Sequence, residues 1–189
     1  MSNFIVLEGI DGSGKSSLAR FFKEEHEKVF LTREPTDLPA GRLAQKAAHE
    51  ETSPFKDLFL YLADRVEHTE EIRTKLAENF TVICDRYWGS TAAYQAAYDE
   101  IELKYAEEIQ MPFILKPDIT FLFDLDPEIS LDRLSDREQK SKYEKLDFLR
   151  KVRQNYLTLA ERHDWIIVNA EESLEKVKKE FLDSVEKLS

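Results

Sequence analysis

The sequence predicts an α/β fold of three layers, in which a five-stranded parallel sheet is flanked by helices. Two observations predict this fold. Five short runs rich in Val, Ile and Phe recur along the chain, and longer charged segments lie between them. Strands buried on both faces, joined by amphipathic crossover helices, produce this alternation. With 189 residues, 42% hydrophobic content and no internal repeat or linker, the chain is expected to form one domain over residues 1–189.

Each expected strand is one of the apolar runs. In chain order the runs are "NFIVLEG", "KVFLTRE", "NFTVICDR", "DITFLFDLD" and "DWIIVNA", at 3–9, 28–34, 79–86, 118–126 and 164–170. Cys84 lies inside the third run, where a small buried side chain is expected only to pack.

The expected helices are the segments with apolar residues three or four positions apart. They cover 15–27, 55–78, 90–110, 127–135, 142–163 and 171–188. In the fifth segment the apolar stripe consists of Leu146, Leu149, Val152, Tyr156, Leu159 and Ala160. All six prolines fall outside the helix interiors, as their missing N–H group requires.

A glycine-rich stretch between the first expected strand and the first expected helix fits the pattern G-x-x-x-x-G-K-[ST]. This phosphate-binding P-loop uses backbone amides and a helix N-terminus to hold phosphate oxygens, while its lysine neutralises the β and γ phosphates. We therefore expect a P-loop NTPase fold, a bound nucleoside triphosphate and Mg²⁺ at Ser16. The expected nucleotide-binding residues are Gly9, Ile10, Asp11, Gly12, Ser13, Gly14, Lys15, Ser16 and Ser17.

The P-loop alone indicates binding of a nucleoside triphosphate and leaves the reaction open. The chain has no N-K-x-D guanine signature, which weakens a GTPase interpretation, and no L-S-G-G-Q signature of transporter subunits. Arginines stand at the ends of two expected strands, at Arg33 and Arg86, and Arg65 lies on the helix 55–78. Ligands of open parallel sheets bind at the carboxyl ends of the strands, and arginine binds phosphate bidentately. These arginines therefore indicate a second anionic site beside the P-loop.

The ordered set of motifs resembles the thymidylate kinase family. It consists of "EGIDGSGKSS", "TREPT", "LFLYLADRVEH", "CDRYWGSTAAYQ", "KPDITFLFDLDPEISLDR" and "WIIVNA", and it runs over nearly the whole chain. The resemblance implies ATP-dependent phosphorylation of dTMP to dTDP, a step in dTTP synthesis.

The resemblance also implies roles for single residues. Asp11 would accept a hydrogen bond from the 3′-hydroxyl of dTMP, Arg86 would bind the acceptor phosphate with Arg33 nearby, and Arg65 would address the base. Asp85 would act in catalysis with Lys15 by organising that lysine and the Mg²⁺ held at Ser16.

Further substrate-binding residues come from the segment after Arg86. Tyr94 would crowd the 2′ position of the sugar, unless it only packs in the core, and Ser90, Thr91 and Gln95 would line the same side. Tyr61 stands where the family commonly has a phenylalanine that stacks on thymine, and Thr91 where some members have asparagine or another polar residue.

The segment 132–148 resembles the lid of the family. Members carry a catalytic arginine in the P-loop or in the lid, and here the P-loop position is Gly12, so the lid is expected to supply it. Arg137 is the first candidate and Arg133, which otherwise lies on the adenine, is the second. The alternative is that 136–145 is only a solvated charged loop.

Two other functions stay open from the residues. A deoxynucleoside kinase, or another nucleoside monophosphate kinase, would share the P-loop, and Glu8 could serve a hydroxyl acceptor as base. A nucleotide-dependent switch would bind without turnover, but it needs no second phosphate pocket.

Composition limits the partners and the location. The net charge of −11 argues against nucleic acid and acidic membranes, because the field of the protein repels polyanions. One cysteine excludes an internal disulfide, and no 18-residue apolar stretch or signal segment occurs, so a cytoplasmic protein is expected. A homodimer is expected from the resemblance, with apolar faces of 55–78 and 90–110 at the interface, although these faces suit the core equally well.

Overall fold

Five parallel strands form the centre of the structure, a computed structural model that describes residues 2–135, 143 and 145–188. The strands are β1 (Phe4–Glu8), β2 (Val29–Arg33), β3 (Thr81–Asp85), β4 (Ile119–Asp124) and β5 (Ile166–Asn169). Their order across the sheet is β2-β3-β1-β4-β5, and every neighbouring pair is parallel. The predicted α/β class and parallel sheet are confirmed.

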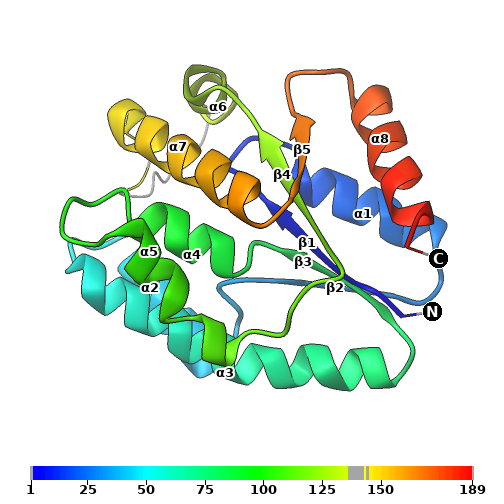
Figure 1. Ribbon diagram of the computed structural model, residues 1–189, viewed down its shortest axis with the longest axis horizontal. Helices are drawn as coiled ribbons and strands as arrows, with labels where there is room; N and C mark the ends of the chain where they lie inside the picture. Colours follow the sequence, from blue (N-terminus) through cyan, green and yellow to red (C-terminus); the bar gives the residue numbers. More distant parts are fainter. Residues whose placement is uncertain (1, 136–142, 144, 189) are drawn as a thin grey trace.

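Helices cover both faces of this sheet. Figure 1 shows α1 and α8 on one face and α3, α4 and α7 on the other. The helices are α1 (Lys15–Glu25), α2 (Pro39–Ala47), α3 (Pro54–Ala77), α4 (Trp88–Gln95), α5 (Leu103–Glu108), the 3₁₀ turn η1 (Met111–Phe113), α6 (Pro127–Arg133), α7 (Leu146–Arg162) and α8 (Leu174–Glu186).

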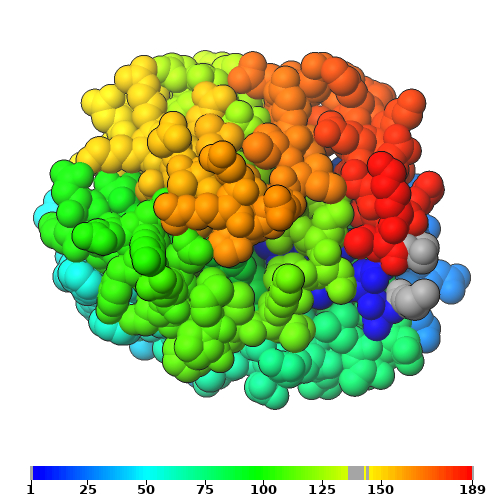
Figure 2. Space-filling view, viewed as in Figure 1, coloured from blue at the N-terminus to red at the C-terminus, as the bar shows by residue number. Residues whose placement is uncertain are grey.

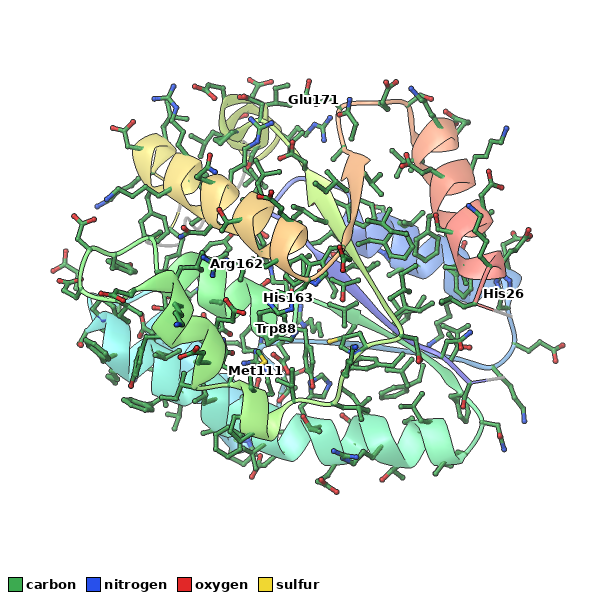
Figure 3. The ribbon with its side chains drawn as sticks, in the orientation of Figure 1. His26, Trp88, Met111, Arg162, His163 and Glu171 are labelled. Carbon is green, nitrogen blue, oxygen red and sulfur yellow. The ribbon has the colours of Figure 1, made fainter. Side chains whose placement is uncertain are left out.

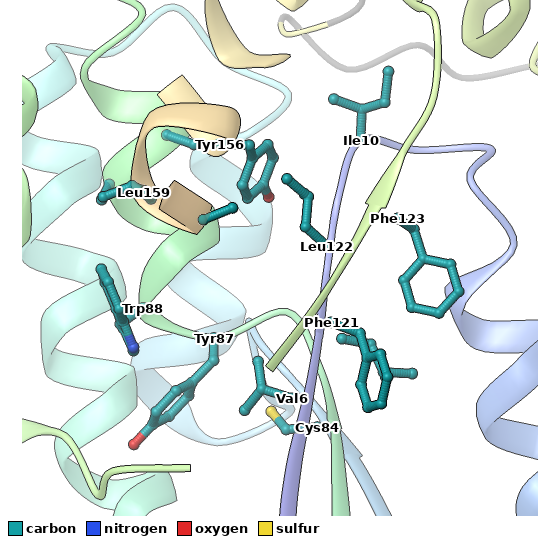
Figure 4. Packing of buried hydrophobic residues seen from close by; sticks show 14 of the residues in the cluster. Val6, Ile10, Cys84, Tyr87, Trp88, Phe121, Leu122, Phe123, Tyr156 and Leu159 are labelled. Atoms are coloured by element: carbon teal, nitrogen blue, oxygen red, sulfur yellow. The ribbon is translucent and has the colours of Figure 1, made fainter. Parts of the chain in front are cut away.

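The core lies on both sides of the sheet. Figure 4 shows Phe121 and Phe123 pointing to one side, while Tyr156 and Leu159 of α7 lie on the other. In the apolar stripe predicted for this helix, every residue except the half-buried Leu146 is buried. Cys84 is fully buried in the same core.

Polar and aromatic side chains at the end of α7 contact α4 and α5. The space-filling view shows the orange part of α7 directly against the green segment that contains α5 (Figure 2). Arg162 and His163, at the end of α7, both contact Glu107 of α5, at 3.0 and 2.8 Å. Trp88, at the start of α4, stacks edge-on against His163 (Figure 3). These contacts hold α4, and with it the segment after Arg86, in a fixed place.

The prediction of one helix over 90–110 was wrong. The structure has α4 and α5 with a turn between them, in which Tyr98 N–H bonds Gln95 O and Ile101 N–H bonds Tyr98 O. The turn directs Ala97 and Ile101 into the core, so burial outweighs the helical periodicity of the sequence.

The helix α2 was not predicted. Pro39 occupies its first turn, and Gly41 lowers its intrinsic helix propensity. Gly41 is required by packing, since a Cβ there would lie 2.3 Å from Thr36 O. None of the described helices is both long and apolar enough to cross a lipid bilayer.

Candidate functional site

The loop between β1 and α1 has the geometry that its glycines predict. Gly9 has φ 139°, and a Cβ there would lie 2.6 Å from Phe123 O. Gly12 has φ 76° and lies close to Ser130 of α6. Side chains disfavour this region of φ, so the loop needs glycine at both positions. The first turn of α1 directs its free N–H groups toward the loop, which favours an anion there.

Lys15 is buried within this loop. Its Nζ donates to Gly9 O at 2.9 Å, Ile10 O at 2.8 Å and Ser13 Oγ at 3.1 Å. Burial of the ammonium, together with the positive charge of Arg86, lowers the pKa of Lys15 to about 8. Gly9 and Ile10 therefore hold the Lys15 ammonium with their carbonyl oxygens. A phosphate bound in the loop would favour the charged form of Lys15, which burial disfavours.

Ser16 and Asp85 lie together beside the loop. The Ser16 hydroxyl donates to Asp85 Oδ2, and the sheet register places Asp85 directly beside Leu7 of β1 and Arg33 of β2. Asp85 Oδ1 is buried and has no hydrogen-bond partner within the described chain. One hydroxyl and one carboxylate with a free oxygen fit Mg²⁺, which takes few protein ligands and completes its shell with water and phosphate oxygens.

A cavity of about 540 Å³ opens over the loop. Most of the predicted ATP-binding residues line it, namely Asp11, Gly12, Ser13, Gly14, Lys15, Ser16 and Ser17, and Asp85 and Arg133 line it as well. Its wall carries donors suited to phosphate oxygens, namely the loop amides, Lys15 and Arg86.

A second cavity, of about 430 Å³, lies on the other side of Arg86. The predicted substrate-binding residues on its wall are Asp11, Arg33, Tyr61, Arg86, Ser90, Thr91, Tyr94 and Gln95. The structure thus brings together, around one cavity, residues that the sequence separates by more than eighty positions.

Among the described residues, three line both cavities: Asp11, Arg33 and Arg86. Arg86 donates from Nη2 to Asp11 Oδ1 at 2.9 Å and from Nη1 to Ser90 Oγ at 3.2 Å. Its backbone has φ 71°, a conformation that non-glycine residues rarely adopt and that occurs often at functional sites. The guanidinium groups of Arg33 and Arg86 therefore belong to the region where the two cavities meet.

Aromatic side chains form much of the second cavity. Tyr94 lies with its ring 5.1 Å from the Arg86 guanidinium and 5.4 Å from the Tyr143 ring. Burial raises the pKa of Tyr94 to about 12 and raises the pKa of Tyr61, so both phenols are neutral at physiological pH. Gln95 is fully buried, and its amide has no partner within hydrogen-bond geometry in the described chain, although it lies near the Tyr143 hydroxyl.

Arg65 does not line either cavity. Its guanidinium is buried behind the wall and donates to Glu34, to Gln110 and to Thr91 Oγ1. Direct contact between Arg65 and a base stays a prediction from the resemblance.

Sequence reasoning missed several residues on the second cavity: Glu34, Pro35, Gln45, Ala48, His49, Tyr87 and Tyr143. Gln45 belongs to α2 and His49 lies just after it, and no sequence pattern predicted this helix. Tyr143 was detectable as the one aromatic residue in the charged segment 136–145.

Glu8 lies beneath the site and faces neither cavity. Its carboxylate accepts hydrogen bonds from Tyr87 N–H at 3.1 Å and Ser90 Oγ at 2.5 Å, and burial raises its pKa. Glu8 therefore positions the segment after Arg86, and a role as base for a hydroxyl acceptor is not favoured.

Of the two lid arginines, only Arg133 belongs to the described residues. It ends α6 and donates to Gly12 O at 2.9 Å and to Ala170 O at 3.3 Å, so it joins the P-loop to the loop after β5. Arg137 and about half of the predicted lid, residues 136–142 and 144, lie outside the described residues.

The parallel sheet, the P-loop and a second cavity that meets the first at two arginines define a P-loop phosphotransferase. Comparison with known proteins agrees with this class. The family model for thymidylate kinase matches residues 7–181, and this chain belongs to the thymidylate kinase family.

Curated relatives match over nearly their full length. A probable thymidylate kinase of Thermococcus kodakarensis is 39% identical, with 98% of each chain covered. Those of Methanosarcina mazei and Pyrobaculum aerophilum are 38% and 36% identical, covering 96% and 98% of this chain and 94% and 97% of their own.

Proposed function

We propose that this protein transfers the γ-phosphoryl group of ATP to the 5′-phosphate of dTMP. A phosphate oxygen of dTMP forms the new bond to the γ-phosphorus, the bond to the bridging oxygen of ATP breaks, and dTDP and ADP leave. Membership of the thymidylate kinase family supports this reaction. The attacking oxygen is already anionic, so the reaction needs no general base, and Glu8 is free for its structural role.

The observation that carries the proposal is the junction of the two cavities. Asp11, Arg33 and Arg86 line both, so an acceptor phosphate bound by the arginines would face the terminal phosphate of a nucleotide on the P-loop. In-line transfer depends mostly on such alignment and on positive charge around the migrating group. A nucleotide switch needs no second phosphate site, which disfavours that alternative.

Lys15 and the N-terminus of α1 bind the donor phosphates. Ser16 and Asp85 would hold Mg²⁺, which would neutralise negative charge on the donor phosphates. Asp85 Oδ1, buried without a hydrogen-bond partner in the described chain, supports this assignment.

The second cavity takes dTMP. Arg86, with Arg33, binds its phosphate; Asp11 receives the 3′-hydroxyl; and Tyr94 fills the space that a 2′-hydroxyl would need. Tyr61 offers a ring face to the base, and the buried amide of Gln95, which lies near the Tyr143 hydroxyl, offers hydrogen-bond donors and an acceptor.

Arg137 supplies the catalytic positive charge from the lid, and Arg133 holds the P-loop and the adenine side. The bonds of Arg133 to Gly12 O and Ala170 O support this division of roles. Arg137→Ala should lower kcat by about a hundredfold or more with little change in the Kd for dTMP. Full turnover in Arg137→Ala with loss in Arg133→Ala would reverse the assignment.

We also propose that the protein is a cytoplasmic homodimer. Its three exposed large apolar side chains on α3, Phe55, Phe59 and Val66, lie four and seven positions apart and therefore share one helix face. Tyr105 of α5 is also exposed and contacts Phe55, with 6.3 Å between the ring centres. A second copy of the chain would cover this surface.

Calorimetric titration with dTMP alone tests the second site separately from turnover. The proposal predicts saturable binding of dTMP without ATP, which Arg86→Ala weakens by about tenfold or more. No heat with dTMP, in protein that binds ATP, would favour a switch without an acceptor site.

A further inference from the structure

Helix α6 packs directly on the middle of the P-loop. The hydroxyl of Ser130, a fully buried residue of α6, donates to Asp11 O at 2.7 Å. Arg133, at the end of the same helix, donates to Gly12 O at 2.9 Å. A Cβ on Gly12 would lie 3.4 Å from Ser130 O, so the backbones of the loop and the helix are close together. Two successive carbonyl groups of the loop are therefore held by α6.

These two bonds fix the direction of two N–H groups. The carbonyls that α6 holds share their peptide groups with the N–H of Gly12 and the N–H of Ser13. Both peptide bonds are trans, and in a trans peptide the carbonyl and the N–H point in opposite directions. The N–H groups of Gly12 and Ser13 are therefore turned away from the side chains of α6 that hold the loop.

The two N–H groups belong to the donor site. Gly12 and Ser13 both line the cavity over the P-loop, and neither N–H group has an acceptor within the described part of the chain. Successive N–H groups of this kind bind phosphate oxygens. Gly12 directly follows Asp11, which lines both cavities, so its N–H belongs to the part of the loop at the junction.

Ion pairs hold the start of α6 in place. Asp124, at the end of β4, binds Arg153 of α7 through both carboxylate oxygens, at 2.7 and 2.8 Å. Arg153 also donates to Asp126 at 3.1 Å, and Asp126 caps α6 by accepting from Glu128 N–H. Figure 1 shows α6 beside α7. Because these charged bonds fix α6 independently of the P-loop, Ser130 is a firm support for the loop.

We propose that Ser130 is a positioning residue for phosphoryl transfer, which acts through Asp11 O to set the Gly12 N–H toward the phosphates of the donor nucleotide. This rests on the proposed function, because it assigns a support to the donor side of the same site.

Selective isotope labelling reads the Gly12 N–H directly. The sequence contains a single Asp-Gly pair, Asp11-Gly12, so labelling aspartate with ¹³C at the carbonyl and glycine with ¹⁵N identifies the Gly12 signal in NMR spectra. We expect ATP with Mg²⁺, without an acceptor, to move the Gly12 amide proton downfield in the wild-type protein, as a bond to a phosphate oxygen requires. Ser130→Ala should reduce this shift markedly.

The rate of transfer provides the second readout. Ser130→Ala should lower kcat by about three- to tenfold, while the Kd for dTMP changes by less than about twofold. Ser130→Cys has nearly the same size but a weak donor, so its kcat should fall between these two proteins. Ser184→Ala is the matched control, because it removes a serine bond of 2.8 Å to a backbone carbonyl in α8, far from the loop in the sequence, and should change neither kcat nor the Gly12 shift.

A role of Ser130 in stability alone has a different result. It would lower the melting temperature of Ser130→Ala and leave the Gly12 shift and kcat as in the wild-type protein, and either value unchanged would overturn the proposal. If Ser130→Ala fails to melt cooperatively, Ser130→Cys decides by the same two measurements.

Failure of the proposed function is distinguishable from failure of this inference. In that case the wild-type protein would not phosphorylate dTMP at all, whereas the Gly12 shift is measured with ATP alone and would still report the effect of Ser130 on a bound nucleotide.

Discussion

At the scale of single residues, the chemistry depends on how burial and neighbouring charges shift the pKa values of a few groups. Lys15 has a pKa of about 8, against an ordinary value of 10.5, because its ammonium is buried and lies near Arg86. In the free protein the unfolded chain binds more protons than the folded chain between these two values. This lysine therefore raises the free energy of unfolding as the pH increases through that interval.

Nucleotide binding should reverse the shift of Lys15. Negative phosphate charge favours the ammonium form, so at about pH 8.5 binding of ATP should take up a fraction of a proton. Calorimetry in two buffers of different ionisation enthalpy measures this uptake, and Lys15→Met should abolish it. Equal heats in the two buffers for the wild-type protein at that pH would contradict the account of Lys15.

Tyr94 is predicted to exclude ribose by size. Tyr94→Ala should bring the ratio of kcat/KM values for dUMP and UMP closer to one by about tenfold, because the space for a 2′-hydroxyl is opened. Tyr94→Phe keeps the ring and removes the hydroxyl that accepts from Arg86 at 3.3 Å, so it should keep the sugar selection. A ratio unchanged in Tyr94→Ala, in protein that melts cooperatively, would remove Tyr94 from the sugar site.

At the scale of helices and strands, the sequence was most informative where local spacing determines the element. The P-loop and the five strands follow from short patterns, and the stripe on α7 follows from helical periodicity. The α2 helix was missed because Gly41 and Pro39 weaken the local signal, while its close contact with Thr36 is a matter of tertiary packing.

The candidate site likewise contains residues that local motifs reveal and residues that only tertiary packing brings there. Lys15, Ser16 and Arg86 could be found from motifs, whereas the burial of Arg65 could not, because it depends on Glu34, Gln110 and Thr91 arriving from three separate segments. His49 and Tyr143 reach the acceptor cavity through tertiary packing, which no local pattern specifies.

The contribution of α7 to stability is testable by truncation of its buried stripe. Leu159 is fully buried, so Leu159→Ala should lower the free energy of unfolding by about 2–5 kcal/mol through lost burial and a cavity. Glu161→Ala, on the exposed side of the same helix, should change it by less than about 0.5 kcal/mol. Chemical denaturation of the two variants measures both values, and similar losses would contradict the assigned faces.

At the scale of the whole molecule, the exposed apolar face of α3 predicts self-association. Phe59 is 52% exposed, and Phe59→Glu should convert a dimer into a monomer in sedimentation velocity, because a charge cannot be buried there without a partner. Leu174→Glu is the matched control, since Leu174 is 48% exposed on α8, which covers the opposite face of the sheet. A wild-type protein that sediments as a monomer at micromolar concentration would rule out this interface.

The two cavities that meet at Asp11, Arg33 and Arg86 make one prediction about the entire protein, that it transfers a phosphoryl group from a nucleoside triphosphate to a nucleoside monophosphate. The most direct measurement is ADP release from ATP, coupled to a spectroscopic readout, with dTMP, dUMP, UMP, dCMP, AMP or thymidine as acceptor. We expect the highest kcat/KM with dTMP, a lower value with dUMP, and negligible ADP release with thymidine or without an acceptor. Faster ADP release with thymidine than with dTMP, or a rate of ADP release that no acceptor changes, would contradict it.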